Sequence, residues 1–271
     1  NSPSMDDVQR NMAHRVSSLM NQIGNLDYRI AVTTTDPKNP RTGDGNLLPL
    51  TGFAGQYIIT PAMGFNNAQA ALKNTVQRPE IGSASEQGIY ATYRMIEKAL
   101  AKSKHEKDFF RSDAAFSVIL ISDGNESGIG VKNQPKSLIN LVKKNWPNKK
   151  FNFNSVIVRP GDKACLKDRE AYGNAYDMLS RMLGYGTPGG SIIGTVCAND
   201  YGAQLSGIGN SVQQMVKIID LQCAPIGNPT TAVTVWKDGA AYNDAYEIQG
   251  LKIIFRNNLP AGNYSLNYKC Q

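Results

Sequence analysis

The chain has 271 residues and a formal net charge of +7, with 41% hydrophobic and 19% charged residues. These values are ordinary for a soluble globular protein and allow one large core with a small appendage. Apolar runs stay shorter than the roughly 20 residues that span a bilayer, which excludes a membrane-spanning segment within this sequence.

The positive charge concentrates in two lysine-rich stretches, residues 98–107 and 143–150. They indicate either an anionic partner or the solvated faces of helices near their C-termini, where lysine complements the helix dipole. Aromatic residues do not alternate with these lysines, as they would on a platform for single-stranded nucleic acid. We therefore expect no nucleic-acid partner.

The four cysteines show no CxxC or Cys/His spacing that would indicate structural zinc. An even number of widely spaced cysteines favours two disulfides, and hence an extracytoplasmic location in the periplasm, at the cell surface or in the medium. Four free thiols in a cytosolic protein are the alternative. Sequence order favours the pairs Cys165–Cys197 and Cys223–Cys270, because each pair then brackets one segment, but spacing leaves other pairings open.

Apolar residues recur at helical spacing from Val8 to Ile23, which predicts a first helix that ends at Gly24. Strands are expected over 28–35 and 56–60. Further along the chain the pattern predicts helices over 66–76, 86–102, 135–146, 168–184 and 205–221, and strands over 116–122, 151–158 and 190–196.

Strands that alternate with helices predict an α/β fold, with a doubly wound, mostly parallel sheet and helices on both faces. Residues 116–122, "FSVILIS", form the continuous apolar run typical of a strand buried on both faces. A sheet of this class normally begins with a strand, whereas the first element here is a helix. The sequence therefore predicts a first strand just upstream of Asn1.

From Cys223 onward the pattern changes. Residues 230–242 alternate with period two and contain an Asp-Gly hairpin signal, and residues 250–270 predict another strand pair around a Pro-Ala-Gly turn. We expect an α/β domain over 1–222 and a small antiparallel β appendage over 223–271, which could contact the first domain within the same chain.

Three segments rich in small hydroxyl residues should lie at one edge of the sheet. Residues 1–4 precede the first helix, residues 82–88 precede the helix expected from residue 86, and residues 122–127 follow the buried strand. Open α/β sheets bind ligands beyond the carboxyl ends of their strands. The three segments together therefore mark the expected binding site.

This arrangement resembles the von Willebrand factor type A (vWA) domain with its metal-ion-dependent adhesion site, in its bacterial extracytoplasmic form. The family motif is Asp-x-Ser-x-Ser after the first strand, a Thr in a second loop and an Asp in a third. Ser2 and Ser4 match the two serines, Ser83 stands in place of the threonine, and Asp123 in "ILISDG" matches the third-loop aspartate. The resemblance covers roughly residues 1–221 and implies an Asp directly before Asn1.

The resemblance implies that Ser2, Ser4, Ser83 and Asp123, together with the Asp expected before Asn1, hold Mg²⁺, or Mn²⁺ or Ca²⁺ in its place. Oxygen ligands of this kind suit hard cations. Because the serines are neutral, the cation keeps much of its charge, and in the family an open coordination position takes a carboxylate from the partner. The implied function is cation-dependent adhesion to a protein, peptide or glycan, without catalysis.

Each of these residues also has a purely structural interpretation. Ser4, and Ser83 or Ser85, would serve as helix N-caps, and Asp123 could belong to a plain turn. Glu86 is either a hydrogen-bond acceptor behind the site or a carboxylate in the first turn of a helix.

Two other functions remain open. One is an interaction module of the same fold that needs no metal and binds through its loops or basic faces. The other is a hydrolase on a similar sheet. The hydrolase is weaker, since His14 and His105 lie on polar stretches and the sequence has no Ser-His-Asp order, nucleophile elbow or phosphate loop.

Overall fold

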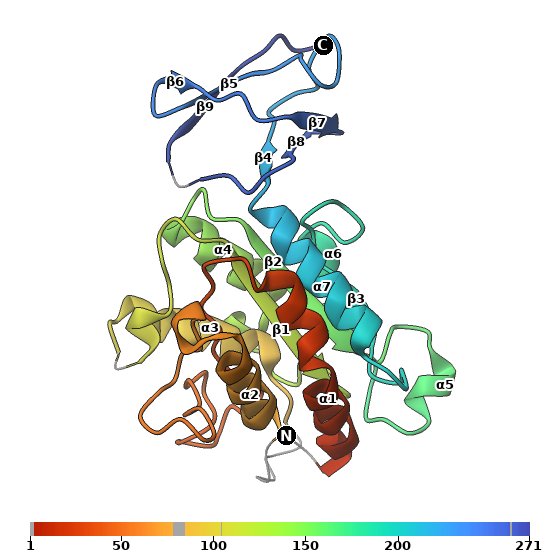
Figure 1. The fold of residues 1–271 in the computed structure, drawn as a ribbon. Helices are drawn as coiled ribbons and strands as arrows, with labels where there is room; N and C mark the ends of the chain where they lie inside the picture. Colours follow the sequence, from red (N-terminus) through yellow and green to blue (C-terminus); the bar gives the residue numbers. More distant parts are fainter. Residues whose placement is uncertain (1–2, 78–84, 104, 261) are drawn as a thin grey trace. The chain divides into compact units, whose positions relative to one another are not determined.

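The structure is a computed structural model, and it describes residues 3–77, 85–103, 105–260 and 262–271 (Figure 1). It is a mixed α/β structure with one parallel sheet and separate small antiparallel sheets. The chain divides into two compact units, Asn1–Ser211 and Val212–Gln271. The domain boundary predicted between residues 222 and 223 stays a prediction.

The parallel sheet has three strands in the order β1-β2-β3, namely β1 (Phe116–Ser122), β2 (Phe151–Ile157) and β3 (Ile193–Thr195). The register of β1 and β2 runs from Phe116 opposite Phe151 to Ser122 opposite Ile157. Both strands therefore end level, and the residues that follow them start from the same edge of the sheet. The strand predicted over residues 116–122 is confirmed.

One face of this sheet is covered by α3 (Gly88–Leu100), α4 (Pro135–Asn145) and α6 (Asn174–Met182). Alternate residues of each strand point to the same face of the sheet. On this face they pack against the apolar sides of the three helices and form one core with them. Burial of this apolar surface is the main stabilising contribution on this side of the sheet. The core includes Ile89, Ile96, Phe116, Leu120, Leu138, Val142, Phe153, Ile157, Tyr176, Leu179 and Ile193.

The opposite face carries α7 (Gly202–Met215), beside which lies α1 (Asp6–Ile23) (Figure 1). Asn152 of β2 donates from Nδ2 to Ser211 Oγ of α7 at 3.2 Å, and Gln22 of α1 donates from Nε2 to Ser206 Oγ at 3.2 Å. Gly209 permits this close approach, since a Cβ there would lie 2.5 Å from the Cβ of Gln22. Helix α2 (Phe65–Val76) packs on α1.

The remaining elements of the first unit are short. They are η1 (Pro3–Met5), η2 (Pro61–Met63), η3 (Glu106–Asp108), η4 (Val131–Asn133) and α5 (Lys163–Leu166).

The strands predicted over residues 28–35 and 56–60 do not form a ladder. Their pairing in the described chain is one isolated antiparallel bridge, between Ile30 and Ile59. Loop residues take other hydrogen-bonding positions of the first segment: the N–H of Leu48 donates to the Val32 carbonyl at 2.8 Å. Among the described residues, neither segment has a strand beside it that would complete a sheet. The strand expected upstream of Asn1 lies outside the sequence and stays a prediction.

The second unit holds two three-stranded antiparallel sheets. One contains β4 (Ile218–Asp220), β7 (Tyr246–Gln249) and β8 (Lys252–Phe255), and the other β5 (Thr234–Lys237), β6 (Ala240–Ala241) and β9 (Tyr264–Asn267). The Asp238-Gly239 turn between β5 and β6 has φ values of 51° and 83°, as a type I′ hairpin requires. The predicted Asp-Gly hairpin is confirmed.

Two expectations for the C-terminal region are wrong. The helix predicted over 205–221 ends at Met215, and Ile218–Asp220 instead pairs with β8. The strands expected to pair with each other across the Pro-Ala-Gly turn pair elsewhere: β8 lies between β4 and β7, and β9 pairs with β5. These pairings join segments far apart in the sequence, which local alternation does not reveal.

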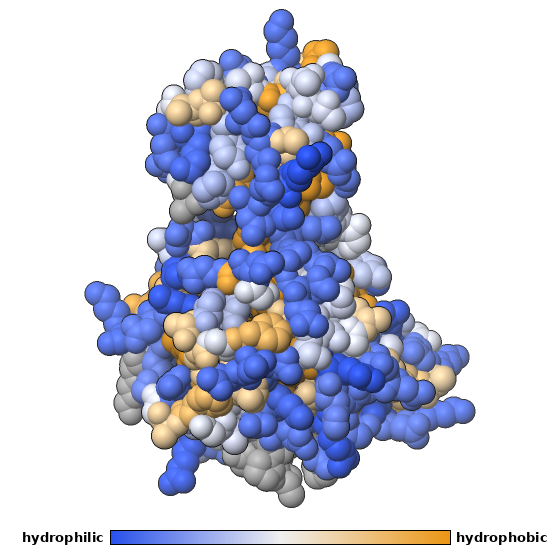
Figure 2. Space-filling view, viewed as in Figure 1, coloured by the Kyte–Doolittle hydropathy of each residue, from blue (hydrophilic) through white to orange (hydrophobic). Residues whose placement is uncertain are grey.

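Both predicted disulfides are present, Cys165–Cys197 and Cys223–Cys270, with Cα–Cα distances of 5.7 and 5.6 Å. They are consistent with an extracytoplasmic protein. Hydrophilic residues cover most of the face shown in Figure 2. Among the described residues, no helix combines the length and apolar character needed to cross a bilayer.

Candidate functional site

The structure describes two of the four predicted metal ligands. Ser4 lies in η1, directly ahead of α1, and Asp123 is the first residue after β1. Ser2 and Ser83 lie outside the described residues. The geometry of the site is therefore built from Ser4, Asp123 and their neighbours.

Asp123 is fully buried, with an exposed fraction of 0%. Neither of its carboxylate oxygens has a hydrogen-bond partner among the described residues. A buried carboxylate without hydrogen bonds costs several kcal/mol unless a nearby positive charge compensates it. The end of β1 therefore carries an acceptor group that suits a cation.

The turn after Asp123 brings other carboxylates close. Ser122 Oγ accepts a hydrogen bond from the N–H of Gly124 at 3.2 Å, which tightens the turn. A Cβ on Gly124 would lie 3.1 Å from Glu86 Cγ and 3.4 Å from Glu170 Oε2. Because Gly124 has no side chain, the side chains of Glu86 and Glu170 can both lie close to the end of β1.

Glu86 lies behind the end of β1 and is only 2% exposed. Its Oε2 accepts hydrogen bonds from Thr35 Oγ1 at 2.5 Å and from Ser122 Oγ at 3.3 Å. Helix α3 begins at Gly88, so Glu86 precedes the first turn rather than belonging to it. Of its two interpretations, that of an acceptor beside Asp123 fits the geometry.

The loop that carries Asp123 is fastened to the start of α3. The Glu126 carboxylate accepts from the N–H groups of Ile89 at 2.8 Å and Tyr90 at 3.2 Å, two donors that the helix itself leaves unpaired. Burial raises the pKa of Glu126, although these hydrogen bonds act in the opposite direction. Ser127 adds a hydroxyl contact to Ser85 at 2.9 Å. Residues 122–127 are therefore held in one place.

The N-cap interpretation does not account for the serines that are described. The cap residue of α1 is Met5 and that of α3 is Gln87, and neither makes a side-chain cap hydrogen bond. Ser4 Oγ donates to Glu170 Oε1 at 3.4 Å, and Ser85 Oγ bonds with Ser127. The cap interpretation of Ser83 falls outside the described residues.

The loop that links α5 to α6 joins Ser4 to Asp123. Arg169 donates from Nη1 to the Ser4 carbonyl at 2.9 Å, and the N–H of Ala171 donates to the Asp123 carbonyl at 3.1 Å. Glu170, between them, reaches Ser4 with its carboxylate. Three successive residues thus bridge the two described members of the predicted ligand set.

The helix predicted over residues 168–184 is corrected by this loop, because α6 begins only at Asn174. Sequence reasoning therefore missed Arg169 and Glu170 as site residues. Gly173 was the available signal. A Cβ there would lie 2.9 Å from the Ile157 Cβ, so glycine allows the chain to cross close to the end of β2 before α6 begins.

Arg169 supplies positive charge near the buried carboxylate. Its guanidinium makes two hydrogen bonds to Asp7, at 2.6 and 3.1 Å, which lower the pKa of that carboxyl and raise the pKa of Arg169. The charge of Asp123 also contributes to raising the pKa of Arg169. Arg169 therefore balances part of the negative charge at this edge while its hydrogen bonds go to Asp7 and Ser4.

No three His, Cys, Asp or Glu side chains gather into a metal-holding group within the part of the chain that the structure describes. This finding concerns sites rich in carboxylate, imidazole or thiolate. The predicted ligand set has one carboxylate and three hydroxyls within the chain, and a second carboxylate in the Asp expected before Asn1, so the finding does not test it.

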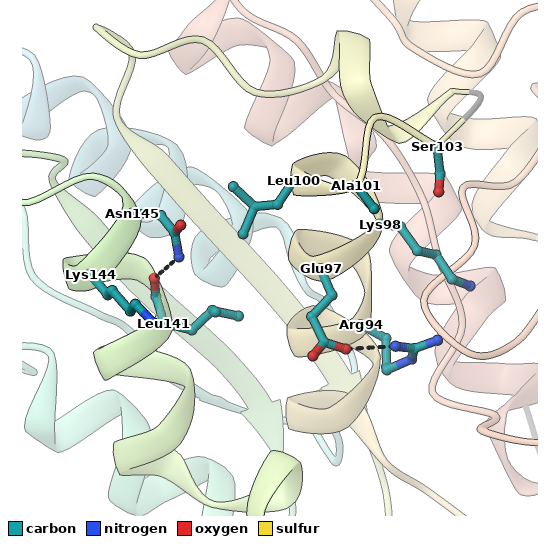
Figure 3. A pocket seen from close by; sticks show the side chains of 9 residues that line it. All are labelled: Arg94, Glu97, Lys98, Leu100, Ala101, Ser103, Leu141, Lys144 and Asn145. Atoms are coloured by element: carbon teal, nitrogen blue, oxygen red, sulfur yellow. Dashed lines mark hydrogen bonds and ion pairs between the residues drawn. The ribbon is translucent and has the colours of Figure 1, made fainter.

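A groove between α3 and α4 is the alternative place for a ligand (Figure 3). Its lining includes Lys98 from one lysine-rich stretch and Lys144 from the other. Lys98 already donates to the Asp44 carbonyl at 2.7 Å and to Asn46 Oδ1 at 2.6 Å. Arg94, also in the lining, pairs with Asp44 and Glu97. Much of the positive charge of the groove is thus compensated within the protein, which weakens it as an anion site.

No model of a known protein family matches the chain, and no curated protein is significantly similar to it in sequence.

Proposed function

We propose that this chain is a divalent-cation-dependent adhesion domain with a doubly wound, vWA-like fold. In this proposal Ser2, Ser4, Ser83 and Asp123 hold Mg²⁺, with Mn²⁺ or Ca²⁺ as substitutes. The observation that carries the proposal is the Asp123 carboxylate, which is fully buried at the end of β1 with no hydrogen-bond partner for either oxygen among the described residues.

The surroundings of Asp123 fit a hard cation. The Ser4 side chain supplies a hydroxyl oxygen joined to the same edge through Glu170, and Glu86 accepts a hydrogen bond from Ser122, the residue before Asp123. Oxygen donors of this kind suit Mg²⁺, which takes about six oxygens and keeps several waters. A retained water marks a position that a carboxylate from another molecule can occupy.

The proposed activity is adhesion. A cation held mainly by neutral hydroxyls keeps its charge and attracts an anionic group, and binding of this kind needs no base or nucleophile. The partner class is a protein or glycan that offers a carboxylate. An extracytoplasmic location is proposed with it, in the periplasm, at the cell surface or in the medium, supported by the two disulfides.

A metal-independent interaction module is the second candidate, and Arg169 is the observation that favours it. Its guanidinium is close enough to Asp123 for the two charges to interact. A protein that neutralises Asp123 internally needs no cation at this edge. The two candidates predict opposite results in a metal titration.

The test is calorimetric titration with Mn²⁺ and Mg²⁺. It compares the protein with two variants, and all three carry the Asp that the proposal expects before Asn1. Asp123→Ala removes the buried carboxylate. Asp113→Ala is the matched control, because Asp113 is exposed and precedes the other end of β1. The proposal expects saturable binding that Asp123→Ala abolishes and Asp113→Ala retains. Binding that survives Asp123→Ala, or no binding by the unaltered protein, overturns it.

A further inference from the structure

We propose that Glu170 is an additional ligand for the cation, an internal carboxylate that closes the open coordination position until a partner's carboxylate displaces it. The inference rests on the proposed function. In this inference, Glu170 occupies the coordination position of the cation that the carboxylate of a partner molecule must take.

The placement of the Glu170 carboxylate carries the proposal. Its Oε1 accepts from Ser4 Oγ at 3.4 Å. Its Oε2 lies 3.4 Å from the point where a Cβ of Gly124 would stand. The two oxygens therefore reach toward the two segments that hold Ser4 and Asp123, so the carboxylate lies between these segments.

The backbone on either side holds Glu170 in this position. Arg169 is tied to the Ser4 carbonyl and Ala171 to the Asp123 carbonyl. The same loop follows α5, which the Cys165–Cys197 disulfide fastens beyond β3. Because the backbone is held on both sides, the rotamers of the Glu170 side chain are what remains to be ordered when it binds a cation.

Asp123 supplies the second, independent observation. Its buried carboxylate has no partner among the described residues and lies next in sequence to Gly124. Both carboxylates belong to residues at the turn of Gly124: Asp123 precedes it in the chain, and Glu170 Oε2 faces it. A divalent ion bound between two carboxylates removes the repulsion of their charges. Arg169 does not take this role through hydrogen bonds, since those in the structure go to Asp7 and Ser4.

Glu170 differs from Asp123 in that it is exposed. A buried ligand stays in place, whereas an exposed one can swing away into water and leave its coordination position to a competitor. The internal carboxylate would then raise the affinity for the cation and lower the affinity for an external carboxylate. Opposite effects on these two affinities are the signature of the mechanism.

The experiment compares Glu170→Gln with the unaltered protein, both carrying the Asp that the proposal expects before Asn1. Asp168→Asn is the matched control, since Asp168 is exposed in the same loop, two residues earlier. The first probe is Mn²⁺ alone, measured by calorimetry. The second is a tetraglutamate peptide titrated into protein saturated with Mn²⁺, and then into protein with EDTA.

Glu170→Gln is expected to weaken Mn²⁺ binding about tenfold and to strengthen Mn²⁺-dependent peptide binding. Asp168→Asn should change neither. Glu170→Asp, which keeps the charge, should restore part of the Mn²⁺ affinity. A structural role alone would shift the melting temperature without moving the two affinities in opposite directions.

Failure of this inference can be told apart from failure of the proposed function. If the unaltered protein binds Mn²⁺ through Asp123 but Glu170→Gln leaves both affinities unchanged, or moves them in the same direction, Glu170 is not a ligand and the adhesion proposal stands. If the unaltered protein does not bind Mn²⁺ at all, both proposals fall.

Discussion

The N–H of Ala171 donates to the carbonyl of Asp123 at 3.1 Å. This hydrogen bond joins the loop before α6 to the end of β1, where Glu170 Oε2 lies close to Gly124, the residue after Asp123. The candidate site is therefore built by two connections that follow parallel strands of one sheet, together with the turn before α1. What this edge can bind depends chiefly on how the charge of Asp123 is balanced.

Replacing Asp123 with Asn should have opposite effects on stability with and without a divalent cation. In EDTA the variant should be more stable by about 1–3 kcal/mol, because a buried charge without hydrogen bonds is replaced by a neutral amide. In excess Mg²⁺ the unaltered protein should gain about 2.7 kcal/mol at a hundredfold excess over its dissociation constant, and the variant nothing. Urea unfolding in both buffers measures the two differences.

The control for this variant is Asp113→Asn, which should change stability little in either buffer. A loss of stability by Asp123→Asn in EDTA would contradict the prediction. It would mean that a protein group, with Arg169 the first candidate, already compensates the carboxylate.

The elements around the site were predictable where local pattern and tertiary environment agree. The apolar run of residues 116–122 forms β1 with the expected bounds, and the apolar face from Val8 to Ile23 forms α1. Asp123 follows directly from this, because a carboxylate after a buried parallel strand must lie at the carboxyl edge of the sheet.

The loop that carries Glu170 was not predictable, because tertiary contacts override local preference there. Arg, Glu and Ala are all good helix formers, so residues 168–184 read as one continuous helix. The hydrogen bonds from Arg169 to Ser4 and from Ala171 to Asp123 hold the chain in a loop instead. Ser4 and Asp123 are distant from this loop in the sequence, so the local residue pattern gives no sign of these hydrogen bonds.

Glu126 should make the stability of the protein depend on pH. Burial raises its pKa above the ordinary 4.5, so ionisation costs the folded state more than the unfolded chain. Its contribution is fully present below pH 4.5 and is lost as pH rises through the higher pKa of the folded state. Relative to Glu126→Gln, the unaltered protein should therefore lose stability over this window and then level off.

Urea unfolding of both proteins between about pH 4 and 8 would test this dependence. The comparison cancels the titration of every other group. The Gln side chain keeps only one of the two acceptor oxygens, and this loss adds a constant offset to the stability difference. A stability difference that stays flat across the range would contradict the role of burial at Glu126.

Asp44 should behave in the opposite sense. Burial would raise its pKa, but hydrogen bonds from Arg94, Lys98 and Tyr90 outweigh burial and hold the pKa well below 3.8. This stabilisation is present above pH 3.8 and declines as pH falls toward the pKa of the folded state. Asp44→Asn should cost about 1–2 kcal/mol at neutral pH, and the cost should shrink in acid.

Asn suits this position because Asp44 has a φ of 52°, a conformation that Asn tolerates. The control is Asp27→Asn, which breaks the ion pair with Arg111. The Asp27 side chain is 83% exposed, and pairs of this kind contribute about 0–1 kcal/mol. Denaturant unfolding that gives equal losses for both variants would contradict the importance of the Asp44 cluster.

The Cys223–Cys270 disulfide should stabilise the second unit selectively. This unit, Val212–Gln271, has a small buried core of Leu221, Val233, Val235, Ile253 and Phe255, and a chain segment so short gains little from burial alone. Removing a native disulfide from a small domain costs about 2–5 kcal/mol. Replacing both cysteines with serine should therefore unfold this unit at much lower denaturant concentration.

The two tryptophans report on the units separately, with Trp146 in the first and Trp236 in the second. In the Cys223→Ser, Cys270→Ser protein, Trp146→Phe leaves only the fluorescence of Trp236, whose transition should move to lower urea. Trp236→Phe leaves only Trp146, whose transition should stay. The Cys165→Ser, Cys197→Ser protein should give the reverse, because that disulfide lies in the first unit. A single transition that shifts equally for both tryptophans would show that the units unfold together, and that each disulfide stabilises the chain as a whole.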